Sequence, residues 1–163
     1  MKTSFWKLNL VLISLFYISL QSLLFGQTGF QNFIARVNSL SGNSALQSSV
    51  IDSFLVYAIP RGIPYIEGET ANFIYRGTAS MAAVAGDFND WNPSASQMTR
   101  LSGTDFFYFS KKFELNARLD YKLVLNGTNW ILDPRNQKQA PGGYGPNSEL
   151  AMPLYVQPWE INF

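Results

Sequence analysis

The 163-residue sequence contains neither cysteine nor histidine. Without cysteine, the chain can form no disulfide bond, no thiolate metal site and no cysteine nucleophile. Without histidine, it lacks the commonest general base, the commonest zinc ligand and every Ser-His-Asp arrangement. These two absences exclude most familiar hydrolytic chemistries, and we expect a protein without a metal, a cofactor or catalytic residues.

The sequence also has no large excess of charge. Twelve basic residues stand against 11 acidic ones, which gives a formal net charge of +1, so no basic surface for nucleic acid is indicated. The chain is rich in apolar residues, with 47% hydrophobic and 15% aromatic residues. This composition is sufficient for a real core, and the aromatic share favours a β-rich domain.

The N-terminus has the form of a secretory signal peptide over residues 1 to 26. Lys2 and Lys7 precede an apolar run over residues 8 to 25, and Gly26 is suited to a cleavage site. The alternative is an uncleaved membrane anchor, because about 18 apolar residues can just span a bilayer. Cleavage predicts a secreted or periplasmic protein that has no membrane contact afterwards.

Two amphipathic helices are predicted over the next segment, residues 27 to 60. Apolar residues recur at helical spacing on both sides of a break at Ser41-Gly42-Asn43, and Ser44-Ala45-Leu46-Gln47 fits a capping box. Pro60 ends the second helix. The two predicted stripes consist of Phe30, Phe33, Ile34, Val37 and Leu40 and of Leu46, Val50, Phe54, Leu55 and Ala58.

After a linker-like stretch at residues 60 to 64, the apolar period changes to two. Short candidate strands bounded by Gly, Pro, Asn or Asp predict a mainly β fold, an antiparallel sandwich over residues 66 to 157, followed by a truncated linker at 158 to 163. No helix of any length is expected after residue 70. The candidate strands are residues 71–76, 80–85, 106–115, 119–125, 129–132 and 149–156.

One hairpin leaves its register open. Asn126-Gly127 is a strong turn signal after a strand whose core face carries Tyr121 and Leu123. A two-residue turn would pair Leu123 with Trp130 and send this tryptophan into the core. A three-residue loop over 125 to 127 would pair Lys122 with Trp130 on the outer face.

A second tryptophan, Trp91, stands in the loop Gly-Asp-Phe-Asn-Asp-Trp-Asn-Pro at residues 86 to 93. Such a large apolar side chain within a run of turn formers has two explanations. Either Trp91 folds back to plug the sandwich, or it remains exposed and contacts a ligand.

The order of motifs GDFNDWNP, LDYKLVLNGTNWILDP and GGYGPNSEL resembles carbohydrate-binding module family 48. These are early-set immunoglobulin-like domains that include the glycogen-binding domain of the AMP-activated kinase β subunit. The resemblance covers roughly residues 71 to 157. More narrowly, the sequence resembles the N-terminal module that precedes exported bacterial esterases of the enterochelin-esterase and feruloyl-esterase type, in which a separate α/β-hydrolase domain carries the activity.

The resemblance implies an immunoglobulin-like sandwich and a set of sugar-binding residues. By motif, Trp91, Lys122, Trp130 and Asn147 match the family's binding positions. The glycogen-binding relatives carry a leucine in the loop before the late asparagine, whereas here Tyr144 occupies that loop and is the substitute contact. The implied ligand is a polysaccharide or oligosaccharide.

Three functional hypotheses follow. The first is a non-catalytic carbohydrate-binding module of an exported esterase-type protein. The second is an interaction domain that docks on a separate or lost esterase domain without binding sugar. The third is a free-standing enzyme with paired carboxylates among Asp87, Asp90, Asp105 and Asp120. It is disfavoured because aspartates in loops are usually turn formers and no G-x-S-x-G motif is present.

Overall fold

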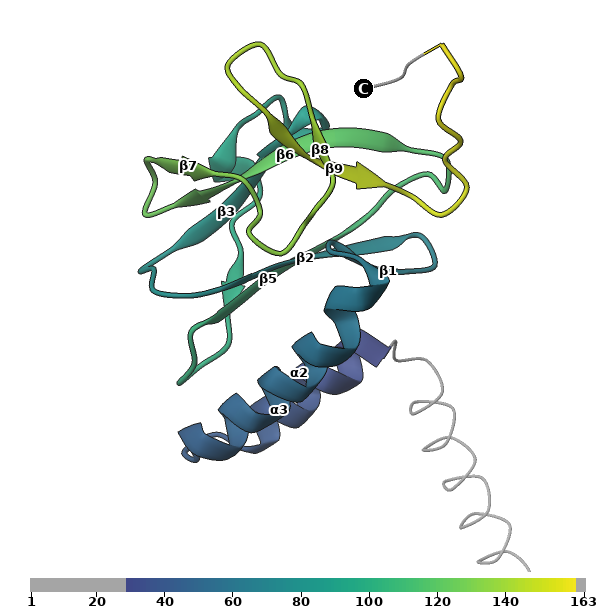
Figure 1. Ribbon diagram of the computed structural model, residues 1–163. Helices are drawn as coiled ribbons and strands as arrows, with labels where there is room; N and C mark the ends of the chain where they lie inside the picture. The colour runs from purple at the N-terminus through teal and green to yellow at the C-terminus, as the bar shows by residue number, and fades with distance from the viewer. Residues whose placement is uncertain (1–28, 161–163) are drawn as a thin grey trace, which may run out of the picture.

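The computed structural model describes residues 29 to 160, and the predicted signal peptide lies outside these residues. The described chain has three layers (Figure 1). Helices α2 and α3 cover one side of a sheet with the strand order β1-β2-β5-β4, and a second sheet, β3-β6-β9-β8, lies on its other side. Strand β7 pairs with β6. The predicted mainly β antiparallel sandwich with two preceding helices is confirmed.

The two helices begin and end close to the predicted positions. Helix α2 spans Gly29–Ser39, and its four stripe residues Phe30, Phe33, Ile34 and Val37 are buried as predicted. Helix α3 spans Ser44–Ala58, but the predicted capping box is wrong. Asn43 is the N-cap, and its Oδ1 accepts a hydrogen bond from Leu46 N at 3.1 Å.

The predicted stripe on α3 is correct at Leu55 and Ala58, which are buried, but wrong at Leu46. Leu46 is 49% exposed, whereas Gln47 is 2% exposed, and Ile51 and Leu55 are buried with it. Gln47 Nε2 donates hydrogen bonds to the carbonyls of Val37 and Ser102, each at 3.2 Å. The buried amide therefore ties α2, α3 and the loop before β5 together.

Nine strands lie within residues 29 to 160. They are β1 Tyr65–Glu67, β2 Thr70–Arg76, β3 Ala82–Gly86, β4 Thr99–Arg100, β5 Phe106–Lys112, β6 Arg118–Leu125, β7 Asn129–Ile131, β8 Gln139–Ala140 and β9 Asn147–Ala151. All six predicted segments contain a strand, but the last ends at residue 151 and not at 156. The short strands β1, β4 and β8 were not predicted. One-turn 3-10 helices are also present at η1 Ile59–Arg61, η2 Asp87–Asn89 and η3 Pro93–Ala95, the last two in the region where no helix was expected.

Two apolar clusters hold the layers together. Between the sheets, the rings of Phe73 and Tyr121 meet edge to face with their centroids 4.9 Å apart. Between the helices and β1-β2-β5-β4, Phe33 of α2 meets Phe106 of β5 edge to face with the centroids 5.4 Å apart. Ile63, in the segment predicted as linker-like, is only 5% exposed and belongs to the helix–sheet cluster.

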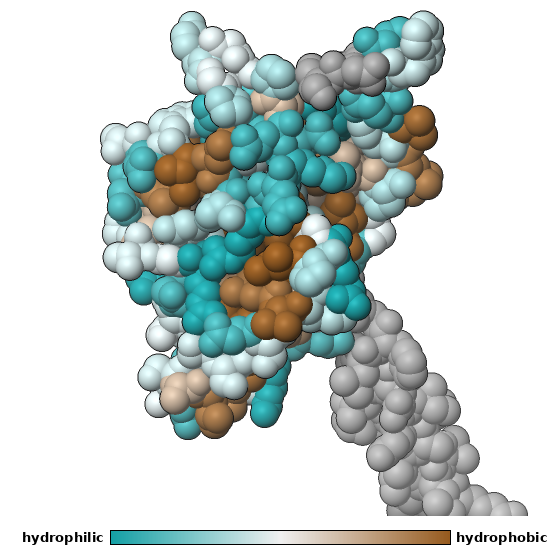
Figure 2. Space-filling view, viewed as in Figure 1, coloured by the Kyte–Doolittle hydropathy of each residue, from teal (hydrophilic) through white to brown (hydrophobic). Residues whose placement is uncertain are grey.

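The helices thus bury their apolar stripes on the sandwich itself. On the face of the molecule shown in Figure 2, hydrophobic residues form separate patches surrounded by hydrophilic ones. No helix in the described part of the chain has the length and hydrophobicity to cross a bilayer. The outer face of β3-β6-β9-β8, which no helix covers, carries the candidate site.

Candidate functional site

The loop around Trp91 is fixed by its own side chains. Asn89 Oδ1 accepts a hydrogen bond from Gly86 N at 2.9 Å, and Asn89 Nδ2 donates to Val84 O at 2.9 Å. Asp90 and Trp91 then take positive φ angles of 53° and 58°, and Trp91 N donates to Gly86 O at 3.0 Å. Two consecutive left-handed residues reverse the chain, so the indole returns over β3.

Trp91 neither plugs the space between the sheets nor stands free. Its half-buried side chain packs on Ala83, Ala85 and Val124, which form a small cluster on the outer face of the sheet. The two alanines leave room for the indole above β3. Trp91 is therefore held on the sheet with part of its surface open to solvent.

Trp130 also stands on the outer face, through a register that the sequence did not predict. Val124 pairs with Trp130 and Leu125 with Asn129, so the turn consists of residues 126 to 128. Neither predicted partner of Trp130, Leu123 or Lys122, is correct. Because Val124 and Lys122 are two residues apart on β6, both side chains still share the face of Trp130, which is 43% exposed.

All five residues that the sequence nominated line one open cavity of about 750 Å³, which we call the aromatic cavity. It is lined by Asp87, Trp91, Asp120, Lys122, Trp130, Gly142, Gly143, Tyr144 and Asn147. These residues come from the loop after β3, from β6, from β7 and from the loop and strand at β9. The geometry gathers the nominated residues, and their role in binding stays a prediction.

Asp87 is a cavity residue whose position in the site the sequence analysis missed. Its Oδ1 accepts a hydrogen bond from Trp91 Nε1 at 3.1 Å, and its Oδ2 accepts one from Asp120 N at 2.7 Å. Asp87 thus connects the tryptophan loop to β6. The four-residue spacing of Asp87 and Trp91 was the available signal, but in a loop it predicts no contact.

Asp120 is the second carboxylate that lines the aromatic cavity. Its Oδ2 accepts a hydrogen bond from Asn147 Nδ2 at 3.1 Å, and its Oδ1 forms an ion pair with Arg118 Nη1 at 2.7 Å that lacks hydrogen-bond alignment. Arg118 Nη2 lies 3.0 Å from Glu149 Oε2. Asp120 therefore orients the amide of Asn147, and the charge of its carboxylate is neutralised by Arg118.

Lys122 has no such partner. None of the ion pairs within residues 29 to 160 includes its ammonium group. The side chain is half-buried along the sheet, and its Nζ can donate up to three hydrogen bonds. Lys122 is thus a donor in the cavity without a carboxylate partner among these residues.

The glycine-rich loop, which contains Gly142, Gly143 and Gly145, brings Asn147 and Tyr144 into the lining of the aromatic cavity. A Cβ atom on Gly142 would lie 2.6 Å from both Asn147 Nδ2 and Gly145 O, so only glycine fits beneath the amide. Tyr144, which the loop presents between Gly143 and Gly145, is fully exposed. The loop therefore holds the Asn147 amide close to its own backbone and presents the Tyr144 ring to solvent.

Below the site, a buried polar group fixes the chain after β7. Tyr121 Oη donates a hydrogen bond to Asp133 Oδ2 at 2.8 Å, and Asp133 Oδ1 accepts one from Arg135 N at 2.9 Å. Burial raises the pKa of Asp133 and raises the pKa of Tyr121 well above its ordinary value. The chain turns at Asp133-Pro134, where Asn136 N donates a hydrogen bond to Asp133 O at 3.1 Å, and the Asp133 carboxylate anchors this turn to β6.

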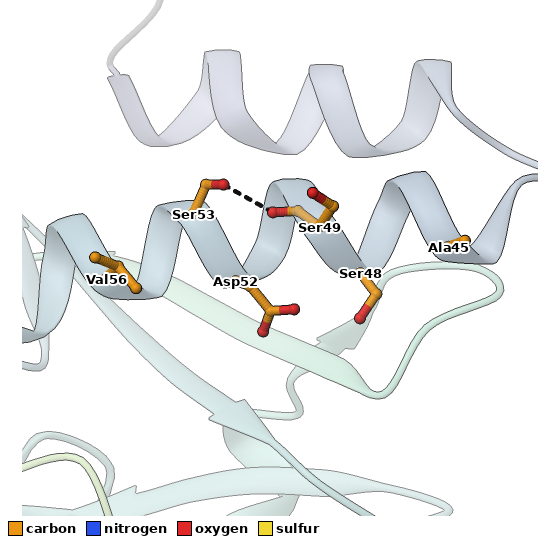
Figure 3. Close-up of a pocket in the computed structure, with 6 residues that line it drawn as sticks. All are labelled: Ala45, Ser48, Ser49, Asp52, Ser53 and Val56. Atoms are coloured by element: carbon orange, nitrogen blue, oxygen red, sulfur yellow. Dashed lines mark hydrogen bonds between the residues drawn. The ribbon is translucent and has the colours of Figure 1, made fainter.

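A second hollow lies along α3 and has a different character (Figure 3). Its volume is about 560 Å³, and its lining consists of Ala45, Ser48, Ser49, Asp52, Ser53 and Val56. Three of its polar side chains are already engaged, because Arg76 binds both Asp52 and Ser48, and Ser53 Oγ donates to Ser49 O at 2.9 Å. In residues 29 to 160, no three acidic side chains gather as metal ligands would.

Solved structures similar to this chain include esterases. The enterobactin esterase Fes from Shigella flexneri, in the presence of enterobactin, matches 54% of this chain and 31% of its own, with 21% identity and a TM-score of 0.46. The ferric enterobactin esterase from Salmonella typhimurium matches 54% of this chain and 32% of its own, with 19% identity and a TM-score of 0.46. The chain thus spans about a third of the length of these esterases.

The other comparisons give no relatives. No protein-family model matches the chain, and no curated protein matches it. The structural similarities therefore assign no activity to this chain, and the functional proposal rests on the geometry of the aromatic cavity.

Proposed function

We propose that the protein is a non-catalytic carbohydrate-binding module that holds a polysaccharide or oligosaccharide in the aromatic cavity. One observation carries this proposal. Two indole rings, Trp91 and Trp130, line one open cavity together with a lysine that has no ion pair among the described residues and an oriented asparagine amide.

These groups match the chemistry of a sugar. The faces of tryptophan rings bury the apolar C–H face of a pyranose, and the Lys122 ammonium and the Asn147 amide donate hydrogen bonds to its hydroxyls. Because the cavity is open, part of the ligand stays hydrated. We expect a weak dissociation constant, on the order of micromolar to millimolar.

The same geometry argues against catalysis. The chain has no histidine or cysteine, and both carboxylates in the cavity are held by other groups. Asp87 accepts hydrogen bonds from Trp91 and Asp120, while Asp120 is bound to Asn147 and Arg118. Glycoside hydrolysis uses one carboxyl group as general acid and another as base or nucleophile, whereas these two carboxylates bind groups of the protein that shape the cavity.

Isothermal titration calorimetry of the purified chain against soluble glucans, xylans and their oligomers tests this function. Trp91→Ala and Trp130→Ala should each weaken binding about tenfold or more, because each removes an aromatic anchor. Trp159→Ala is the matched control, since Trp159 is 82% exposed and lies outside the cavity. Absence of binding heat for every glycan would contradict the proposal.

A second candidate function is docking on an esterase domain. The specific observation is the segment after β9, in which Leu154, Val156 and Trp159 are 62%, 81% and 82% exposed. The helical stripes do not support docking, because they are buried on the sandwich. Co-purification with an α/β-hydrolase domain of the enterobactin-esterase type, lost on Leu154→Ser and Trp159→Ser, would favour docking over sugar binding.

Export through the N-terminal segment is part of the proposal. The segment with Lys2, Lys7 and the following apolar run supports a secreted or periplasmic location. Mass spectrometry of the protein expressed in a bacterial host would detect cleavage after Gly26. An intact N-terminus in the membrane fraction would instead show an uncleaved anchor.

A further inference from the structure

A second groove, separate from the aromatic cavity, lies on the side of the sandwich where β1 approaches β9. It has a volume of about 590 Å³ and lies between residues 59 to 66 on one side and residues 135 to 138 with 149 to 151 on the other. In Figure 1, the connection between β7 and β8 descends toward β1 at this place. We call it the basic groove.

The walls of the basic groove are aliphatic. Ile59, Pro60, Ile63, Pro64, Ile66 and Leu150 line it, and no aromatic ring does. Ile59 is 41% exposed and Ile66 is half-buried, so part of this surface faces solvent. A pyranose finds no flat ring to stack on here, whereas aliphatic side chains of a peptide find matching surface.

Basic side chains outnumber acidic ones in the groove. Arg61, Arg135 and Lys138 line it, and none of the three forms an ion pair within residues 29 to 160. The guanidinium of Arg61 lies 3.8 Å from the ring centroid of Tyr57, which holds the cation in place. The single carboxylate in the lining, Glu149, is already paired with Arg118 at 3.0 Å. Arg61 Nη1 also donates a hydrogen bond to Tyr57 O at 2.7 Å, and Arg135 Nη1 donates one to Arg76 O at 3.4 Å. The three cations therefore have no carboxylate partner within residues 29 to 160, although two of them already bind backbone carbonyls.

The groove also ends at incomplete sheet edges. Strand β1 is the outermost strand of its sheet, and β8 pairs with β9 only at residues 147 and 148. Residues 150 and 151 of β9 therefore have no strand neighbour on that side. An extended chain in the groove would meet backbone groups that can form additional hydrogen bonds.

We propose that the basic groove is a docking site for an extended acidic segment of a partner protein, in which carboxylate and aliphatic side chains alternate. The carboxylates would pair with Arg61, Arg135 and Lys138, and the aliphatic side chains would cover Ile59 and Ile66. This site is independent of sugar binding in the aromatic cavity.

Fluorescence anisotropy with the purified full-length chain tests the proposal. The probe is a short fluorescein-labelled peptide of alternating glutamate and valine. Wild type should bind it, and the combined variant Arg61→Gln, Arg135→Gln and Lys138→Gln should bind about tenfold more weakly, because three carboxylate contacts are lost. The matched control is Arg36→Gln, Lys111→Gln and Lys112→Gln, which removes three cations outside the groove and should leave binding unchanged.

Four results would overturn the proposal. They are no binding of the glutamate–valine peptide by wild type, equal binding of a lysine–valine or a glutamate–serine peptide, equal weakening by the control variant, and tighter binding of an oligogalacturonate than of the peptide. Circular dichroism of both variants verifies folding. Added salt, which screens the three cations, must weaken wild-type binding and so provides a readout that needs no variant.

Discussion

Trp91 owes its place on the sheet to residues of its own loop and of strands β3 and β6. Its left-handed backbone costs about 1 to 2 kcal/mol for a residue with a bulky side chain. The hydrogen bonds of Asn89 and the contact of the indole with Ala83, Ala85 and Val124 offset that cost. Asp87 completes the arrangement by holding the indole nitrogen at 3.1 Å.

Asp87→Ala tests this arrangement. The change leaves Trp91 Nε1 and Asp120 N without their acceptor, and it should lower the free energy of unfolding by about 1 to 2 kcal/mol. Urea denaturation followed by tryptophan fluorescence measures both the stability and the environment of the ring. A variant with wild-type stability and an unchanged emission spectrum would show that Asp87 does not position Trp91.

Gly142 and its neighbour Gly143 provide a matched pair. Gly142→Ala should displace the Asn147 amide and weaken glycan binding, because the new Cβ would lie 2.6 Å from Asn147 Nδ2. Gly143→Ala should be tolerated, because nothing lies within 4 Å of a Cβ at that position. Calorimetric titration measures the glycan affinity of both variants. Equal affinities would contradict the proposed role of the close contact between Gly142 and Asn147.

At the scale of elements, the hairpin between β6 and β7 decides where Trp130 points. Asn126 and Gly127 have positive φ angles of 54° and 80°, and Asn126 Oδ1 accepts hydrogen bonds from Ser80 N and Oγ, both at 2.8 Å. Gly127→Ala should lower the free energy of unfolding by about 1 kcal/mol, because alanine disfavours this backbone conformation. Thermal unfolding measures the loss, and unchanged stability would contradict the role given to the turn.

The sequence predicted elements better than their contacts. Alternation of apolar residues identified six strands, but the register of Trp130 could not be derived, because Asn126-Gly127 suits loops of either two or three residues. In α3 the predicted stripe was correct only in part, because apolar residues occur on several faces of the helix and the polar Gln47 is buried. The strands β1, β4 and β8 contain only two or three residues each, which is too few to show an alternating pattern.

The candidate site was predictable to a similar extent. The order of motifs nominated the two tryptophans, Lys122, Tyr144 and Asn147, and the fold brings all five into one cavity. The hydrogen bonds of Asp87 and Asp120 were not predictable, because they join residues up to 33 positions apart. Such contacts depend on the tertiary register of β3, β6 and β9.

At the scale of the whole molecule, Tyr65 connects the helix layer with the sandwich and gives stability a defined pH dependence. Burial, with the nearby Glu67 carboxylate, raises the pKa of Tyr65 to about 12 from 10.0. Between these values the folded state keeps a proton that the unfolded chain releases, so stability falls as pH rises. This contribution is fully present below pH 10 and is lost toward pH 12.

Tyr65→Phe should make the alkaline decline of stability shallower, because the proton difference at this position disappears. Urea unfolding at a series of pH values above neutrality measures the slope, and Tyr144→Phe, which removes a fully exposed hydroxyl, is the control. An unchanged slope for Tyr65→Phe would show that other groups cause the loss of stability at alkaline pH.

The central claim is that Trp91 and Trp130 together form the glycan platform. The chain has four tryptophans, and nuclear magnetic resonance of nitrogen-15-labelled protein gives each indole Nε1–H its own signal. On titration with the polysaccharide that calorimetry selects, the signals of Trp91 and Trp130 should shift together while that of Trp159 stays in place. Unmoved Trp91 and Trp130 signals at a saturating concentration of the glycan would contradict the account.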